Sequence, residues 1–240
     1  MDVLLLAIDT CDSRGSVAVV RDGEVLGLAK HESAEDYSCW LLPTVEEVMK
    51  KVGCGMAHVE AYGVASGPGS FTGVRVGLTT VKAWGEVYGK PIVAVSRLEA
   101  LALQASGKVE YVAAFANAQR GQVFGAIYRQ EGDGLARVGD EMVIAPGKFV
   151  QTAAELAGGE RIAWVSPDAD CVLKDEGWRV RKELHERIET VSPFLATSIA
   201  GIAAKRVAEG RFTDALALDA NYVRRPDAEI FWKGGPAHGR

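Results

Sequence analysis

The glycine-rich run Gly67-Pro68-Gly69-Ser70-Phe71-Thr72-Gly73 is the part of the sequence with the clearest potential for chemistry. Pro68 restricts its own φ angle, whereas the three glycines allow backbone conformations that are closed to other residues. A helix is predicted directly behind the run, and the unpaired N–H groups at its start could bind a phosphate or another anion. The run lacks the Lys-Ser/Thr pair of a Walker loop. A tight strand-to-helix turn without a ligand explains the same residues equally well.

Asp9 and Thr10 follow a short apolar run, and Asn117 follows a similar run in the second half of the chain. A carboxylate such as that of Asp9 could hold magnesium and phosphate through water, although a capped hairpin is the simpler explanation. Two such turns facing one cleft are the arrangement with which actin-like ATPases bind nucleotide. We therefore expect a nucleotide-like cleft with no certain cofactor, in which ATP or ADP with Mg²⁺ would bind weakly. Its residues would be Asp9, Thr10, Gly67, Gly69, Ser70, Gly73 and Asn117.

The histidines do not predict a metal site. None of the four stands three or four residues from another, which is the spacing of paired ligands on a helix: His31, His58, His185 and His238. The segment from His31 begins like a metalloprotease helix, but Glu35 stands where the second histidine is required. Ser70 has neither the Gly-x-Ser-x-Gly context of a nucleophile nor an identifiable base. We expect no metal and no catalytic residue.

Short strands and helices alternate to position these residues. In the first half we expect strands at 3–8, 16–21 and 24–30, a helix at 38–52, a strand at 60–66, a helix that ends near 88, and a strand at 91–95. Asp22-Gly23 predicts a tight type I′ turn between the second and third strands. Strand, helix and strand in this order imply a parallel, right-handed crossover.

The second half repeats this plan. We expect strands at 111–116, 122–129, 135–144 and 162–165, and a helix at 147–156. The last helix is predicted to begin with Ser192 as its cap and to end at Gly210. Residues 173–189 carry no clear pattern.

The repeated plan predicts an α/β fold of the actin-like (ASKHA, ribonuclease H-like) class, duplicated into two lobes of mixed sheet with helices. The lobes would span residues 1–107 and 108–240. The last helix, at about 192–209, would pack back on the first lobe. The alternative is one α/β domain followed by an unrelated α+β domain.

The predicted helix at 74–88 is apolar over a wider arc than one sheet face covers. Its polar residues occupy one narrow sector: Arg75, Thr79, Lys82 and Glu86. Val74, Leu78 and Val81 share another sector at a coiled-coil-like spacing, and Gly85 continues it. The helix is therefore either buried centrally in the fold or packed on another chain.

The composition argues against a protein that grips RNA unaided. The chain has 27 Lys and Arg against 32 Asp and Glu, a net charge of −5, whereas binding a nucleic-acid backbone favours a basic surplus. The four cysteines are scattered, as reduced thiols would be: Cys11, Cys39, Cys54 and Cys171. The sequence starts without a signal peptide, and no apolar run is long enough to span a membrane. We expect a cytoplasmic protein that contacts no membrane.

Several segments, in this order, resemble the TsaB (YeaZ) family. They are Leu6-Ala7-Ile8-Asp9-Thr10, Leu41-Leu42-Pro43, the run from Gly67 to Gly77, and Val95-Ser96-Arg97-Leu98-Glu99-Ala100-Leu101-Ala102. Beyond about residue 105 the resemblance thins to Gln119-Arg120-Gly121-Gln122-Val123-Phe124 and Asn221-Tyr222-Val223-Arg224. Where relatives commonly show Asp-Ala-Arg, this chain has Asn117-Ala118-Gln119. The loss of that carboxylate argues against metal-linked nucleotide binding by this chain alone.

The resemblance implies a role in making threonylcarbamoyladenosine on tRNA, next to the anticodon. Family members support a paralogous catalytic subunit, TsaD, and an ATPase, TsaE, joins the assembly. The member itself is regarded as non-catalytic, and it would meet tRNA only through the complex. A small-molecule kinase of the actin-like class and a glycoprotease-like hydrolase are the alternatives.

The resemblance also implies a place for the partner. The family paralogues are thought to join through two helices from each chain, which correspond here to the helices at 38–52 and 74–88. The same surface would form a homodimer when the partner is absent. The implied interface residues are Leu41, Leu42, Val45, Val74, Leu78, Val81 and Gly85.

Overall fold

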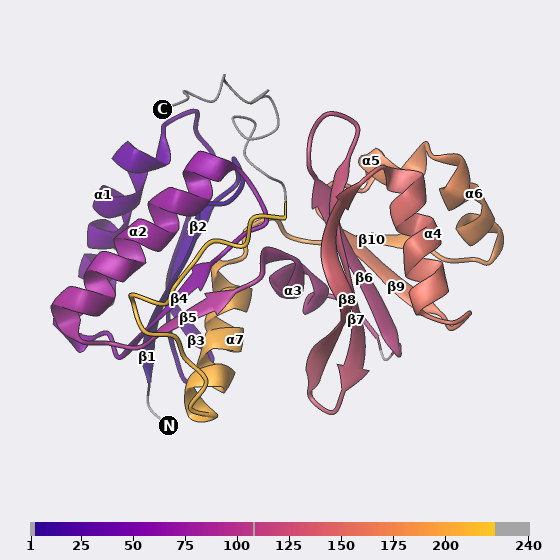
Figure 1. The fold of residues 1–240 in the computed structure, drawn as a ribbon. Coiled ribbons are helices and arrows are strands. Elements are labelled where there is room, and N and C mark those ends of the chain that lie inside the picture. The colour runs from indigo at the N-terminus through magenta and orange to yellow at the C-terminus, as the bar shows by residue number, and fades with distance from the viewer. Residues whose placement is uncertain (1–2, 108, 224–240) are drawn as a thin grey trace, which may run out of the picture.

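Two five-stranded mixed sheets form the frame of the protein (Figure 1). The computed structural model describes residues 3–107 and 109–223. The strands of the first sheet are β1 (Leu4–Asp9), β2 (Ser16–Arg21), β3 (Glu24–Lys30), β4 (Ala61–Ala65) and β5 (Ile92–Val95). They lie in the order β3-β2-β1-β4-β5. β2 pairs antiparallel with β1 and β3, whereas β4 pairs parallel with β1 and β5.

The second sheet repeats this topology. Its strands are β6 (Tyr111–Asn117), β7 (Val123–Glu131), β8 (Gly134–Ile144), β9 (Ile162–Ser166) and β10 (Ile188–Thr190). They lie in the order β8-β7-β6-β9-β10, with the same strand directions as their counterparts in the first sheet. The repeat confirms the predicted duplication. The predicted boundary between the lobes falls at residue 108, outside the described residues, and stays a prediction.

Local signals explain the first hairpin. Asp22 and Gly23 connect β2 to β3 with φ angles of 51° and 81°, as a type I′ turn requires. Every residue of β1 is buried, which fits a strand that is covered by helices on both faces. The predicted turn and buried strand are therefore confirmed.

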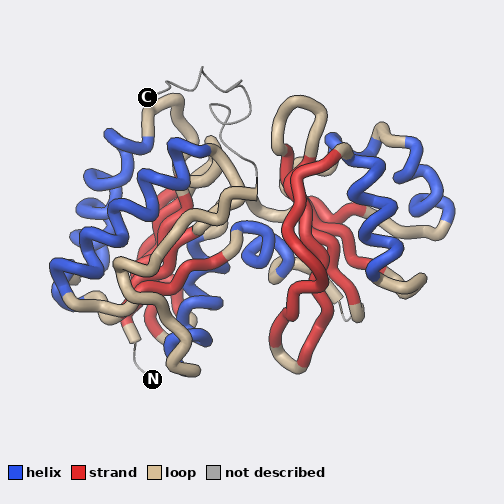
Figure 2. Tube along the Cα trace, viewed as in Figure 1, coloured by secondary structure: helices blue, strands red, loops and turns tan. Residues whose placement is uncertain are grey.

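Helices cover the sheets (Figure 2). α1 (Tyr37–Val52) contacts β2 and β3, α2 (Phe71–Tyr88) contacts β1, β4 and β5, and the 3₁₀ turn η1 (Met56–His58) leads into β4. On the second sheet, α4 (Pro146–Leu156) contacts β7 and β8, and α5 (Asp170–Leu173) and α6 (Glu176–Glu183) pack beside it. α6 and the start of β10 lie in the segment 173–189, which had no clear sequence pattern. No helix in the described part of the chain is long and apolar enough to cross a membrane.

Two helices are exchanged between the sheets. α3 (Arg97–Ala102) follows the first sheet in sequence but contacts β6, β7 and β9 of the second. α7 (Ala196–Ala208) follows the second sheet but contacts β1, β2, β4 and β5 of the first. A Cβ atom on Gly63 of β4 would lie 3.1 Å from Ile199 of α7. The two halves of the chain are thus interlocked.

The last helix begins later than the sequence indicates. Its first residue is Ala196, whose N–H donates a hydrogen bond to the buried Ser16 Oγ at 3.0 Å. The predicted cap, Ser192, instead accepts a bond from the N–H of Phe194 and closes a turn of its own. The helix ends as predicted, just before Gly210, which has a φ angle of 69°. Its start was wrong because a serine–proline pair also suits a turn.

The predicted partner seam on α2 needs correction, because its side chains belong to the core of the monomer. Leu78 is 5% exposed and Val81 is fully buried. A Cβ atom on Gly85 would lie 2.6 Å from Ile92 of β5, so this part of α2 touches its own sheet. The same holds for most of the expected interface: Leu41, Val45, Val74, Leu78, Val81 and Gly85 are all buried. Leu42 differs, with 55% of its surface exposed.

Candidate interlobe cleft

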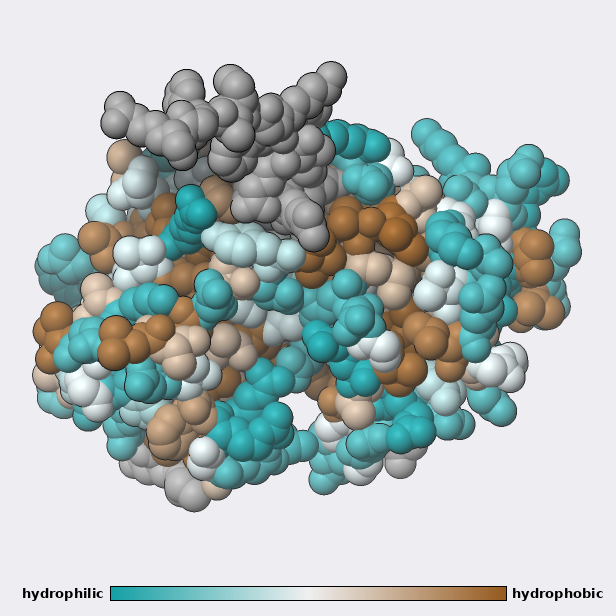
Figure 3. Space-filling model, viewed as in Figure 1, coloured by the Kyte–Doolittle hydropathy of each residue, from teal (hydrophilic) through white to brown (hydrophobic). Residues whose placement is uncertain are grey.

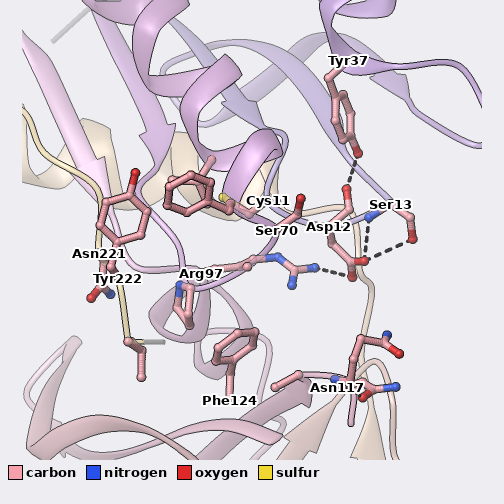
Figure 4. Close-up of a pocket in the computed structure, with 17 residues that line it drawn as sticks. Cys11, Asp12, Ser13, Tyr37, Ser70, Arg97, Asn117, Phe124, Asn221 and Tyr222 are labelled. Atoms are coloured by element: carbon pink, nitrogen blue, oxygen red, sulfur yellow. Dashed lines mark hydrogen bonds and ion pairs between the residues drawn. The ribbon is translucent and has the colours of Figure 1, made fainter. Parts of the chain in front are cut away.

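A cleft of about 720 Å³ opens between the two sheets, where β1 and β6 end (Figure 4). The turn after β1, the glycine-rich run and the start of α3 form one side. The turn after β6 and the start of β7 form the other. Side chains from both sides line the cleft, among them Asp12, Ser70, Arg97, Asn117 and Phe124.

Asp9 does not face this cleft. Its side chain is fully buried, and its Oδ1 accepts a hydrogen bond from the N–H of Cys11 at 2.8 Å. Its Oδ2 lies 3.4 Å from Nε of Arg97. Thr10 is also buried and donates its hydroxyl hydrogen to the carbonyl oxygen of Gly73 at 2.7 Å. These residues tie the turn after β1 to α2 and α3, so the simpler hairpin interpretation describes them better than a magnesium site.

Arg97 is the charged residue of the cleft that sequence patterns did not single out. The side chain is 3% exposed, and its Nη2 donates to Oδ2 of Asp12 at 2.8 Å. Burial lowers the pKa of this guanidinium, but Asp9 and Asp12 outweigh burial and raise its pKa above the ordinary value. Arg97 lies in the segment Ser96-Arg97-Leu98-Glu99, whose pattern indicates the start of a helix. Nothing in that segment marks an arginine for burial between carboxylates.

A second arginine, Arg14, forms ion pairs with carboxylates on both sides of the cleft. Arg14 lies 2.6 Å from Oδ2 of Asp12 and 2.9 Å from Oδ1 of Asp168, which follows β9. Oδ2 of Asp168 accepts a hydrogen bond from the N–H of Asn117 at 3.0 Å. The side-chain oxygen of Asn117 accepts from the N–H of Gln119, so it closes its own turn. Asn117 therefore lines the cleft, as the sequence indicated, but its side chain shapes the turn after β6.

Close approach to the turn after β1 explains the glycines of the run. A Cβ atom on Gly69 would lie 2.2 Å from the carbonyl oxygen of Cys11, and one on Gly73 would lie 2.0 Å from that of Thr10. The N–H of Ser70 donates to the Cys11 carbonyl at 2.7 Å. Ser70 Oγ also caps α2 by accepting from the N–H of Gly73. The structure thus favours a tight turn that packs on its neighbour.

Gly67 and the end of the described chain complete the site. The Gly67 carbonyl accepts from the N–H of Arg97, and the Ser66 carbonyl accepts from the N–H of Asn221. Tyr222 packs its ring 5.1 Å from that of Phe71 at the start of α2. This segment therefore lines the cleft. Arg224, the last residue of the family-like motif, lies outside the described residues.

A magnesium–nucleotide unit does not fit these residues. Both oxygens of Asp9 are already bound, and the Arg97 guanidinium supplies the positive charge beside Asp9 and Asp12. A metal ion would have to displace this buried guanidinium and leave it without a partner, which is costly. The described residues also contain no cluster of three or more His, Cys, Asp or Glu side chains suited to a metal.

The ion pairs of Asp12 predict a measurable acid sensitivity. Burial raises the pKa of this carboxyl, but Arg97 and Arg14 outweigh burial and lower the pKa from 3.8 to about 2. The stability contributed by ionised Asp12 is complete above the ordinary pKa and is lost as the pH falls through the folded-state pKa. We expect a loss of about 2 kcal/mol from the free energy of unfolding between about pH 5 and pH 2.

Denaturant unfolding of wild type and Asp12→Asn across this pH range measures the effect. The variant should lose less stability on acidification, because it has no charge there to lose. Asp133→Asn, in the exposed turn between β7 and β8, is the matched control and should follow wild type. Parallel curves for wild type and Asp12→Asn would contradict the assignment.

Known proteins with similar sequences carry names that refer to the same tRNA modification, threonylcarbamoyladenosine. Residues 25–209 match the family model described as TsaD, tRNA N6-adenosine threonylcarbamoyltransferase. The chain is 26% identical over 245 residues to the tRNA threonylcarbamoyladenosine biosynthesis protein TsaB of Escherichia coli, which covers 97% of this chain and 98% of that protein. It is 31% identical to the protein of the same name from Bacillus subtilis over 134 residues, 56% of this chain and 58% of that protein.

Two solved structures show the same architecture. YeaZ from Pseudomonas aeruginosa superposes with a TM-score of 0.69 at 25% identity, covering 91% of this chain and 99% of that one. A ROK hexokinase from Thermus thermophilus gives a TM-score of 0.50 at 14% identity, covering 86% of this chain and 100% of that one. The hexokinase likeness shows the fold alone. Together with the duplicated sheets, these structures confirm the predicted actin-like class.

Proposed function

The chain belongs to the TsaB family, whose relatives above are named tRNA threonylcarbamoyladenosine biosynthesis proteins, and we propose that it is an accessory subunit of that pathway. It would support a TsaD-like catalytic paralogue and carry out no reaction itself. The observation that carries this proposal is the pairing of Asp9 with buried Arg97. That pairing occupies the carboxylate that the sequence offered as a candidate magnesium ligand.

The exposed side of α1 and α2 is the surface that we assign to the paralogue. A groove of about 560 Å³ runs between the two helices, and Leu42, Arg75 and Thr79 are among the residues that line it. Leu42 is a large apolar side chain in the open. In the space-filling view, apolar and polar residues are interspersed over these helices (Figure 3), as at interfaces between separately folded chains. A second copy of the chain would use the same groove when the paralogue is absent.

The family resemblance and the net charge of the chain indicate how tRNA and the ATPase would enter the complex. With a net charge of −5, the chain is poorly suited to hold tRNA alone, so we propose that it meets tRNA only within the complex. A TsaE-like ATPase would join the same assembly. Because tRNA is the substrate, this work would take place in the cytoplasm.

A charge placed in the groove should weaken binding without unfolding the protein. We expect Leu42→Glu and Thr79→Glu to weaken binding to the TsaD-like paralogue by at least about 30-fold, because each would bury an unpaired carboxylate at the interface. Isothermal titration calorimetry on the purified pair measures the change, and thermal melting checks the fold.

Lys51→Gln is the matched control for this experiment. It shifts the net charge by the same amount, but Lys51 lies nine residues from Leu42, on the opposite side of α1. Its side chain is 71% exposed, and the variant should bind like wild type. Unchanged binding of both groove variants, with the fold intact, would place the partner surface elsewhere.

A further inference from the structure

The charged side chains at the cleft form one continuous chain between the two halves of the protein. Arg97 contacts Asp9 and Asp12, and Asp12 is also paired with Arg14. Arg14 then reaches Asp168 beyond β9 of the second sheet. The other oxygen of Asp168 holds the turn after β6. The chain of ion pairs therefore joins the turn after β1 directly to the turn after β6.

Figure 4 shows the first of these ion pairs, between Arg97 and Asp12, on the side of the cleft opposite Asn117. Here the Arg97 guanidinium supplies positive charge to Asp9 and Asp12, and Arg14 supplies it to Asp12 and Asp168. Charge-assisted bonds of this kind are stronger and more directional than neutral ones. The protein therefore contains, in its own side chains, a link across the cleft.

We propose that the ion-pair series Arg97–Asp12–Arg14–Asp168 is an internal clamp that fixes the turn after β1 against the turn after β6 without a bound nucleotide. The two turns that line the cleft are then held in one arrangement by side chains of the protein itself. The clamp rests on the proposed accessory role and adds to it, because turns held by the protein's own side chains need no bound cofactor to keep them in place.

Other contacts between the halves limit what loss of the clamp can do. Glu141 of β8 accepts hydrogen bonds from Ser96 Oγ and from Asn221 Nδ2, each at 2.5 Å. Ser106 donates to Glu189 of β10 at 2.8 Å, and α3 and α7 are exchanged between the sheets. Removing the clamp should therefore loosen the two turns locally while the sheets stay folded.

Hydrogen exchange of backbone amides, followed by mass spectrometry, tests the clamp in the full chain. In Arg14→Ala we expect the turns at 9–15 and 117–122 to exchange about tenfold faster, because charge-assisted bonds are lost. Asp168→Asn keeps an acceptor for the N–H of Asn117 but loses the charge, and it should act similarly. The double variant should exchange no faster than Arg14→Ala, since that single variant already breaks both ion pairs of Arg14.

Arg129→Ala is the matched control, since it breaks the exposed pair of Arg129 with Glu131, within one strand and away from the cleft. It should leave both turns unchanged, and β4 should stay protected in every variant. Millimolar Mg–ATP should not slow exchange of the turns in wild type. Three results would overturn the clamp: unchanged turns in Arg14→Ala, deprotection of β4 together with the turns, or protection of the wild-type turns by Mg–ATP.

Discussion

Replacing Leu78 with glutamate is expected to unfold the protein. Leu78 is 5% exposed and lies on the side of α2 that packs on the first sheet. The change removes a buried aliphatic side chain, which costs about 2–5 kcal/mol, and it places a carboxylate where it has no partner. A combined loss of at least about 4 kcal/mol approaches the lower end of the roughly 5–15 kcal/mol that stabilises an ordinary domain. Thermal and denaturant melting of Leu78→Glu would show a lost or greatly lowered transition.

The neighbouring residue supplies the control. Thr79 is exposed on the same helix, so Thr79→Glu should change the free energy of unfolding by no more than about 0.5 kcal/mol. The pair of variants separates the two interpretations that the sequence left open for this helix. A Leu78→Glu protein that melts like wild type but fails to bind its partner would restore the outward-facing seam.

The sequence predicted most strands and helices because its short-range patterns are strong. The Asp22-Gly23 turn and the buried β1 are both visible in a few adjacent residues. The duplicated topology also followed, since the same order of strands and helices occurs twice. The side of α2 that faces the core was harder to predict, because apolar residues cover most of the surface of this helix. Only the three-dimensional structure shows that Leu78 faces inward.

The site depended on contacts that no local pattern encodes. Asp9 and Arg97 are 88 positions apart, and either one alone is an ordinary residue at the end of a strand or the start of a helix. The glycine-rich run was located correctly, but two explanations fitted it. The choice depends on how closely Gly73 approaches Thr10, which is a tertiary property. Sequence patterns therefore indicated where the cleft lies, and long-range packing determines what it holds.

The accessory role predicts an all-or-none difference in the formation of threonylcarbamoyladenosine, depending on whether the catalytic paralogue is present. This chain mixed with tRNA and threonylcarbamoyl adenylate should form no modified nucleoside above background. The complete mixture, with the TsaD-like paralogue and the TsaE-like ATPase, should form it. The reason is that the buried Asp9 carboxylate is paired with Arg97 and is therefore not free to bind a metal or a substrate.

Omitting this chain from the complete mixture should lower product to near background, because the paralogue would lack its support. Leu42→Glu, which removes the proposed contact and leaves the core intact, should behave like the omission, and Lys51→Gln should behave like wild type.

The most direct test of the account is the amount of threonylcarbamoyladenosine in digested tRNA, measured by mass spectrometry after each of these incubations. We predict product only when this chain and its catalytic paralogue are both present. Product formed by this chain with the paralogue absent, or equal product with this chain omitted, would contradict the accessory role.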